Sequence, residues 1–185
     1  SGNDLFALGS PALAPALTPS GLPAVVLDGF DDKLIRLHAQ APIQGLPNGN
    51  ADRTMFVVTR YNGQTSSGGA AYGTGVDNQT FGPGVSQTNG ALMLMGHGYE
   101  HDLVSMTPGI GAGWLVQTAL LESGIATLFK DDVPIAQWTH TYDTVRSKLE
   151  VGHEIAGSGY VAMDVAAILI YDRALPAAQR QAVSS

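Results

Sequence analysis

Short apolar segments recur along the chain and are separated by Gly, Pro, Asn and Asp. Residues Thr54–Arg60 are β-branched and aromatic, which favours a strand. Glu122–Gly124 are turn residues between two apolar segments and predict a hairpin there. The other predicted strands are Ala24–Leu27, Leu34–Leu37, Ala70–Gly73, Ala91–Met95, Leu103–Met106, Trp114–Leu121, Ile125–Lys130, Val133–Trp138, Leu149–Gly152 and Gly159–Tyr171. This pattern predicts an antiparallel sandwich or barrel.

Three regions extend this picture. The first two short segments, Ala24–Leu27 and Leu34–Leu37, are predicted to form a hairpin around the turn at 28–32. Residues Gly63–Asn89 are dominated by Gly, Ser, Thr, Asn and Gln, so only a short strand is expected there. The end of the chain is predicted to be helical, because Pro176 suits a first helical turn and Ala177–Val183 are good helix formers.

Three segments, in this order, resemble the laminin G-like, concanavalin A-like lectin/glucanase superfamily. Leu22–Leu34 resembles an opening strand that enters an Asp-Gly-x-Asp-Asp turn. Gly124–Ala136 is similar to a later hairpin, with Asp132 where a glycine is usual. Ala167–Arg180 resembles the closing strand and helix. The resemblance implies an all-β fold, a two-sheet antiparallel β-sandwich (jelly roll) with a short C-terminal helix, as a single domain over residues 1–185. It implies no single function, because the superfamily contains lectins, binding modules, glycanases and lyases.

Composition narrows the function classes. The 185 residues, 44% of them hydrophobic, suit one domain with a sizeable core. Nine basic and 16 acidic residues give a net charge of −7, which disfavours nucleic acid and anionic membrane surfaces as partners. Cysteine is absent, which excludes thiol enzymes and cysteine-ligated zinc. No stretch approaches the roughly 20 apolar residues that span a bilayer.

The densest group of functional side chains is Gly96–Asp102. His97 to His101 formally match the H-x-x-E-H zinc pattern. That chemistry requires a helix, so that both imidazoles share one face. Gly96 and Gly98 flank the first histidine, and an apolar strand precedes it, so the pattern argues against this zinc site.

Two other catalytic interpretations remain open. Glu100 and Asp102 would share a strand face, as in the Glu-x-Asp-x-x-Glu strand of laminarinase-type hydrolases that the superfamily contains. Ser105 then stands where the acid/base glutamate is expected, so the carboxylate pair is incomplete. A polysaccharide lyase would need a neutraliser for the uronate carboxylate and a Tyr or His base. No spacing is diagnostic, but the residue types are present in Arg60, Tyr61, Tyr72, His97 and Tyr99.

A binding role fits these residue types better, because imidazole and phenol groups both stack on sugars and form hydrogen bonds with them. The alternative is a polar segment that faces solvent. The predicted ligand-binding residues are Arg60, Tyr72, His97, Tyr99, Glu100, His101 and Asp102. Asp28, Asp31 and Asp32 crowd one turn and are the predicted ligands of a calcium ion, since calcium takes hard oxygen donors in loops.

The sequence therefore predicts a non-catalytic module that binds a glycan, polysaccharide or other ligand within a larger secreted or cell-surface protein. Its other expected partners are the neighbouring domains of that protein, with neither nucleic acid nor membrane among them. The alternatives are a glycanase or lyase of the same fold, and a structural or adhesion domain without a small ligand.

Overall fold

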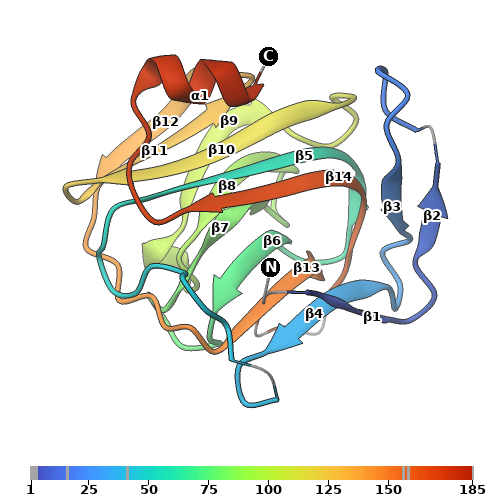
Figure 1. Cartoon of the computed structure of the whole chain (residues 1–185), viewed down its shortest axis with the longest axis horizontal. Coiled ribbons are helices and arrows are strands. Elements are labelled where there is room, and N and C mark those ends of the chain that lie inside the picture. Colours follow the sequence, from blue (N-terminus) through green and yellow to red (C-terminus); the bar gives the residue numbers. More distant parts are fainter. Residues whose placement is uncertain (1–3, 16, 41, 156, 158, 185) are drawn as a thin grey trace.

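The computed structural model describes residues 4–15, 17–40, 42–155, 157 and 159–184, which form two stacked antiparallel sheets (Figure 1). Sheet A contains, in spatial order, β1 (Phe6–Leu8), β4 (Lys33–Leu37), β13 (Lys148–His153), β6 (Gly68–Gly73), β7 (Thr80–Val85), β8 (Ala91–Met95) and β9 (Leu103–Pro108). Sheet B contains β12 (Val133–Thr139), β11 (Ile125–Lys130), β10 (Leu115–Glu122), β5 (Arg53–Gln64), β14 (Val161–Tyr171), β3 (Ala24–Leu27) and β2 (Ala12–Ala14). The predicted β-sandwich is confirmed.

The predicted C-terminal helix is also confirmed, as α1 (Ala177–Ser184). It lies over sheet B, where the guanidinium of Arg180 stands 4.5 Å above the ring of Phe129 on β11 and pairs with Asp132 at 3.5 Å (Figure 1). No helix in the described part of the chain has the length and apolar character needed to cross a bilayer.

The core lies between the sheets and contains one buried polar bridge. Gln117 of β10 is fully buried and reaches across from sheet B to sheet A. Its Nε2 donates to the carbonyls of Gly84 and Met93, at 2.9 and 3.0 Å. The hydroxyl of Tyr61 donates to its Oε1 at 2.8 Å. The amide therefore ties β7 and β8 to sheet B, and these two strands carry part of the candidate site.

The predicted hairpin around the turn at 28–32 is wrong. β3 pairs with β14 and β2 in sheet B, whereas β4 pairs with β13 and β1 in sheet A. The turn therefore joins the two sheets. Asp32, buried in this turn, accepts hydrogen bonds from the backbone N–H groups of Ser10 and Asp28, at 2.5 and 3.3 Å. These bonds to a carboxylate hold the turn, whereas a hairpin would be held by backbone hydrogen bonds between its two strands.

β7 is a strand that the sequence pattern missed. Gly and Pro are rare in strand interiors, and Gly82, Pro83 and Gly84 occupy the middle of this one. The glycines are needed because neighbouring backbone approaches closely: a Cβ at Gly82 would lie 2.2 Å from the carbonyl oxygen of Ala70. The low strand propensity of these three residues therefore predicted a loop, although the packing against β6 makes this segment a strand.

Candidate ligand-binding site

The outer face of sheet A contains two adjoining cavities, of about 320 and 220 Å³. On β8, Leu92 and Leu94 belong to the core between the sheets, so the alternating Met93 and Met95 lie on the opposite face. Both cavities are lined by Ser67, Thr88, Met93, Tyr99 and Asp102. They therefore form one continuous depression across β6 to β9.

The floor of this depression is apolar, since Met93, Met95 and Ile155 line the larger cavity. Met93, Met95, Ala71 and Ile155 form a small buried cluster that is separate from the main core. Gly84 on β7 keeps the floor low, since a Cβ there would lie 2.9 Å from the Met95 methyl group. An apolar floor of this kind suits the C–H face of a sugar ring.

One wall is the turn after β8, where the chain bends sharply. His97 and Gly98 have φ angles of 65° and 87°, and a single 3₁₀ turn, Tyr99–His101, follows. The Asp102 carboxylate holds this bend, because its Oδ1 accepts from the N–H groups of Gly96 and His97 at 2.8 and 3.1 Å. The bend leaves Tyr99 at the rim with 96% of its surface exposed.

The opposite wall is the segment after β13, with Glu154 and Ile155. Oε2 of Glu154 accepts from the Ser66 hydroxyl at 2.5 Å. Burial raises the pKa of Asp102, and the nearby Glu154 adds to the rise, although the two backbone N–H groups lower it. The described cavity lining contains these two carboxylates and no Lys or Arg, so the electrostatic potential there favours neutral or cationic ligands.

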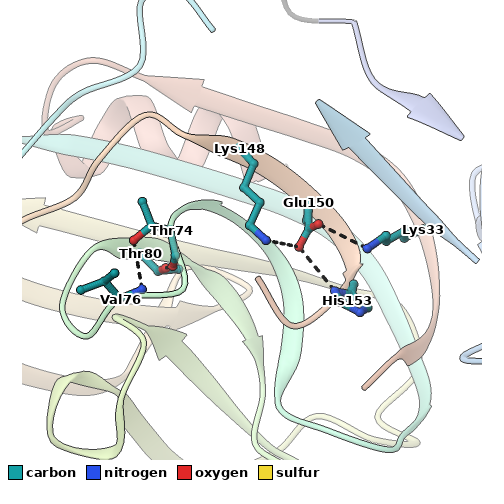
Figure 2. Close-up of polar contacts among 7 residues, drawn as sticks. All are labelled: Lys33, Thr74, Val76, Thr80, Lys148, Glu150 and His153. Carbon is teal, nitrogen blue, oxygen red and sulfur yellow. Dashed lines mark hydrogen bonds and ion pairs between the residues drawn. The ribbon is translucent and has the colours of Figure 1, made fainter. Parts of the chain in front are cut away.

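A second polar group occupies β13 and β4 on the same face of sheet A (Figure 2). Glu150, whose side chain is 2% exposed, lies 3.4 Å from Lys33, 3.6 Å from Lys148 and 3.4 Å from His153. Burial raises the pKa of this carboxyl, but the hydrogen bond from His153 and the two lysines outweigh burial, so the pKa lies below its ordinary value.

The structure brings together only part of the predicted binding group. His97, Tyr99 and Asp102 line the larger cavity. Glu100 is exposed and lies outside the lining of both cavities. His101 is half-buried and its ring faces His140 instead.

Tyr72 and Arg60 lie apart from this group. Tyr72 is fully buried in the core, where its hydroxyl accepts from Arg53 and donates to the Pro47 carbonyl. Arg60 belongs to sheet B and is paired with the buried Asp164 at 2.6 Å. Neighbouring residues of a strand point to opposite faces. Tyr72 therefore belongs to the main core, whereas its neighbour Ala71 packs with Met93 and Met95 on the other side of sheet A.

Neither catalytic pattern is formed by the turn. His97 and His101 do not share a helix of the required length, since the 3₁₀ segment has three residues. Glu100 lies in that segment, and β9 begins only at Leu103, so Glu100 and Asp102 do not share a strand face.

Four further lining residues come from separate loops and were not predicted. Ser67, Gln87, Thr88 and Glu154 line the larger cavity. No local motif marks them, because they meet only through the pairing of β6, β7, β8 and β13. The alternation of β8 was the one available signal, since it assigns Met93 and Met95 to a face distinct from that of their neighbours.

The predicted calcium ligands do converge. One carboxylate oxygen from each of Asp28, Asp31 and Asp32 lies within 4.8 Å of the others. Asp28 and Asp31 are exposed, and Asp32 is buried. Asp28 Oδ1 already accepts from the Phe30 N–H at 2.8 Å, but each carboxylate keeps further lone pairs. The donor set fits calcium, whose remaining ligands would come from backbone carbonyls and water.

The sequence matches no protein-family model and no curated protein. Solved structures share the fold. Domain 4 of AbnA, a GH43 extracellular arabinanase from Geobacillus stearothermophilus, in complex with arabinotriose, is 15% identical, with a TM-score of 0.67 over 96% of this chain and 82% of that chain. The botulinum neurotoxin serotype D/C binding domain is 13% identical, with a TM-score of 0.65 over 98% of this chain and 46% of that one. A Trypanosoma rangeli sialidase is 12% identical, with a TM-score of 0.62 over 87% of this chain, and the match spans only 27% of the sialidase.

Proposed function

We propose that this chain is a non-catalytic carbohydrate-binding module that holds a glycan across the outer face of sheet A. The observation that carries the proposal is the pair of adjoining cavities with an apolar floor and a polar rim. Sugars present both C–H faces and hydroxyl groups, and this surface offers partners for both.

The rim supplies the polar partners. Gln87 and Thr88 are exposed on one side of the larger cavity, and His97 is half-exposed on another. Tyr99 provides an aromatic face that nothing covers, which suits stacking against a sugar ring. Two adjoining cavities suit successive residues of an oligosaccharide better than a single compact ligand.

The charge of the lining favours a class of glycan. Asp102 and Glu154 would repel a uronate, sialate or sulfate group, and the described lining contains no Lys or Arg to offset them. We therefore infer a neutral or amino-sugar polysaccharide as the ligand. The lysines beside Glu150 do not change this inference, because they are paired with that carboxylate.

The fold likeness supports the same class of function. The arabinanase domain is described in complex with arabinotriose, and the neurotoxin domain is described as a binding domain. We infer that this chain belongs to the concanavalin A-like superfamily and that it acts beside other domains of a secreted or cell-surface protein. Such a module would keep those domains at their polysaccharide.

Affinity electrophoresis on a panel of neutral, amino and acidic polysaccharides tests this proposal. Native protein should be retarded by at least one neutral or amino polysaccharide, and Tyr99→Ala should reduce the retardation. Phe30→Ala is the matched control, because Phe30 is an aromatic residue 80% exposed and lies outside both cavities. Retardation only by acidic polysaccharides would contradict the charge argument, and none at all would favour a structural or adhesion domain.

A second candidate function, hydrolysis, rests on one observation: Asp102 and Glu154 line the same cavity. Glycosidases use such a pair as acid and base or nucleophile. Here, however, Asp102 Oδ1 is engaged by two N–H groups and Glu154 by a hydroxyl. We therefore expect no release of reducing ends from a retained polysaccharide. Release that disappears in both Asp102→Asn and Glu154→Gln would show that this expectation is wrong.

We also propose that Asp28, Asp31 and Asp32 bind a structural calcium ion. Its support is the convergence of three carboxylates in the turn that joins the sheets. The ion would offset repulsion between these carboxylates and would rigidify that turn.

A further inference from the structure

Three separate segments meet beside the cavity wall: the β6–β7 turn at 74–79, the turn at 96–102 and the segment after β12. The Asn78 N–H donates to the His97 carbonyl at 2.9 Å, and the Asp143 N–H donates to the Asn78 carbonyl at 3.0 Å. Asn78 thus links the other two segments through its backbone. The position of its side chain is fixed as well.

The β6–β7 turn holds Asn78 in place. The Thr74 hydroxyl accepts from the Val76 N–H at 3.0 Å, and the Thr80 hydroxyl donates to the Thr74 carbonyl at 2.7 Å (Figure 2). Asn78 Nδ2 donates to the Thr141 carbonyl at 2.8 Å, so Oδ1 is the atom that faces His140 Nε2, at 2.9 Å.

His140 is held by two aromatic rings. Trp138 stacks on its imidazole with ring centroids 4.5 Å apart and planes 13° apart. Tyr142 meets it edge-on at 4.7 Å. His101, from the turn at 96–102, completes the group, with its Nδ1 3.4 Å from His140 Nε2. Two imidazole nitrogens from different segments therefore point at each other beside an amide oxygen.

The distance between these nitrogens suits two arrangements. At 3.4 Å it is at the long end for a hydrogen bond, since protein N–H···O bonds are typically about 2.7–3.2 Å long. Two imidazoles on one tetrahedral zinc, each at about 2.0–2.1 Å, have their nitrogens about 3.3–3.4 Å apart. The observed separation is therefore also that of two imidazoles able to share one ion.

We propose that His101 and His140 form a binding site for a divalent transition-metal ion of the Zn²⁺ type, with Asn78 Oδ1 beside the pair and holding His140 in position. Imidazole donors suit Zn²⁺, Ni²⁺ and Cu²⁺, whereas the all-oxygen group at Asp28–Asp32 suits Ca²⁺. Both histidines and Asn78 are half-exposed, so an ion can reach them and water completes its coordination.

A metal ligand must be a neutral imidazole with a free lone pair on the nitrogen that meets the ion. In the arrangement with Asn78, Nε2 carries the proton; ligation places that proton on Nδ1 and frees the Nε2 lone pair for the ion.

The ion would tie the cavity wall to the segment after β12, because His101 belongs to the turn that carries Tyr99. The site is independent of the proposed function, since it needs no glycan. If a glycan does bind, the metal should strengthen its binding by holding that wall in place.

Calorimetric titration of the purified chain with ZnCl₂, and Co²⁺ absorption as a second probe, test the site. We expect one equivalent of Zn²⁺ to bind, and His101→Ala or His140→Ala to weaken binding by at least about tenfold. His97→Ala is the matched control, because His97 lies in the same turn but outside the pair, and it should bind Zn²⁺ like the native chain.

Asn78→Ala adds a milder test, with an expected loss between those of the control and the histidine variants. Circular dichroism establishes that each variant is folded, and His101→Gln replaces His101→Ala if the latter is not. Absence of Zn²⁺ binding by the native chain would overturn the proposal. So would folded His101 and His140 variants that bind Zn²⁺ as tightly as the native chain. Loss of Zn²⁺ binding in Asp31→Asn would assign the ion to the acidic turn and would also overturn it.

Discussion

Single side chains set the shape of the outer-face depression. Asp102 closes the bend after β8, and Tyr99 is exposed at the rim as a result. Gln117 acts from the other side of sheet A, because it donates to the carbonyl of Met93, whose side chain lies in the cavity floor. The position of the floor thus depends on a buried amide from sheet B.

Gln117→Leu should lower the free energy of unfolding by about 3 kcal/mol, because it leaves two buried carbonyls and the Tyr61 hydroxyl without this partner. Urea denaturation measures the change. Gln181→Leu is the matched control, since Gln181 is exposed on α1, and its change should stay within about 0.5 kcal/mol. A similar small change for Gln117→Leu would show that the bridge does not stabilise the sandwich.

At the scale of elements, β4 and β13 are joined by the cluster around Glu150 (Figure 2). The lowered pKa of Glu150 means that its ionised form stabilises the folded state. This contribution is present above the ordinary pKa of 4.5 and is lost as pH falls through the folded-state value. The cluster therefore makes the pairing of these strands sensitive to acid.

Glu150→Gln should reduce stability near neutral pH by about 3 kcal/mol, because the lysines lose their buried partner. The variant should also show a smaller further loss than the native chain as pH is lowered below about 4.5. Thermal unfolding across pH measures both effects. Glu122→Gln, at an exposed position, should follow the native profile. A Glu150→Gln profile parallel to the native one would contradict the assignment.

Most elements could be predicted because apolar alternation and turn chemistry agree along them. β8, β11 and α1 have nearly their predicted bounds. β7 could not be predicted, since Gly82, Pro83 and Gly84 disfavour strands locally, while close backbone contacts with β6 require the two glycines. For the site, His97, Tyr99 and Asp102 were found because they are close in sequence. Glu154 and Ser67 were not, because only the sheet pairing brings them there.

On the scale of the whole molecule, the turn at 28–32 joins the two sheets, and its acidic residues converge there. The sequence predicted the acidic turn but placed it in a hairpin, because local turn chemistry does not reveal which strands lie on either side. Ion binding at this position would stabilise the joint between the sheets.

Calcium should therefore raise the melting temperature, since a ligand of the folded state at about 100 times its Kd contributes about 2.7 kcal/mol. Asp31→Asn should abolish most of this rise while it leaves the fold intact, because Asp31 is exposed. Scanning calorimetry with calcium or EDTA measures it. Asp143→Asn, an exposed change outside the turn, should keep the full response. Equal melting temperatures with calcium and EDTA would contradict calcium binding.

The most direct test is a calorimetric titration with an oligosaccharide derived from a polysaccharide that retards the native protein. The protein titrated is a variant in which a bulky side chain fills the depression on the outer face of sheet A. Ser67 lines both cavities, so Ser67→Trp should abolish binding. Leu169→Trp, which places the same side chain on sheet B, should bind like the native chain. Undiminished binding by a folded Ser67→Trp variant would show that the glycan is held elsewhere.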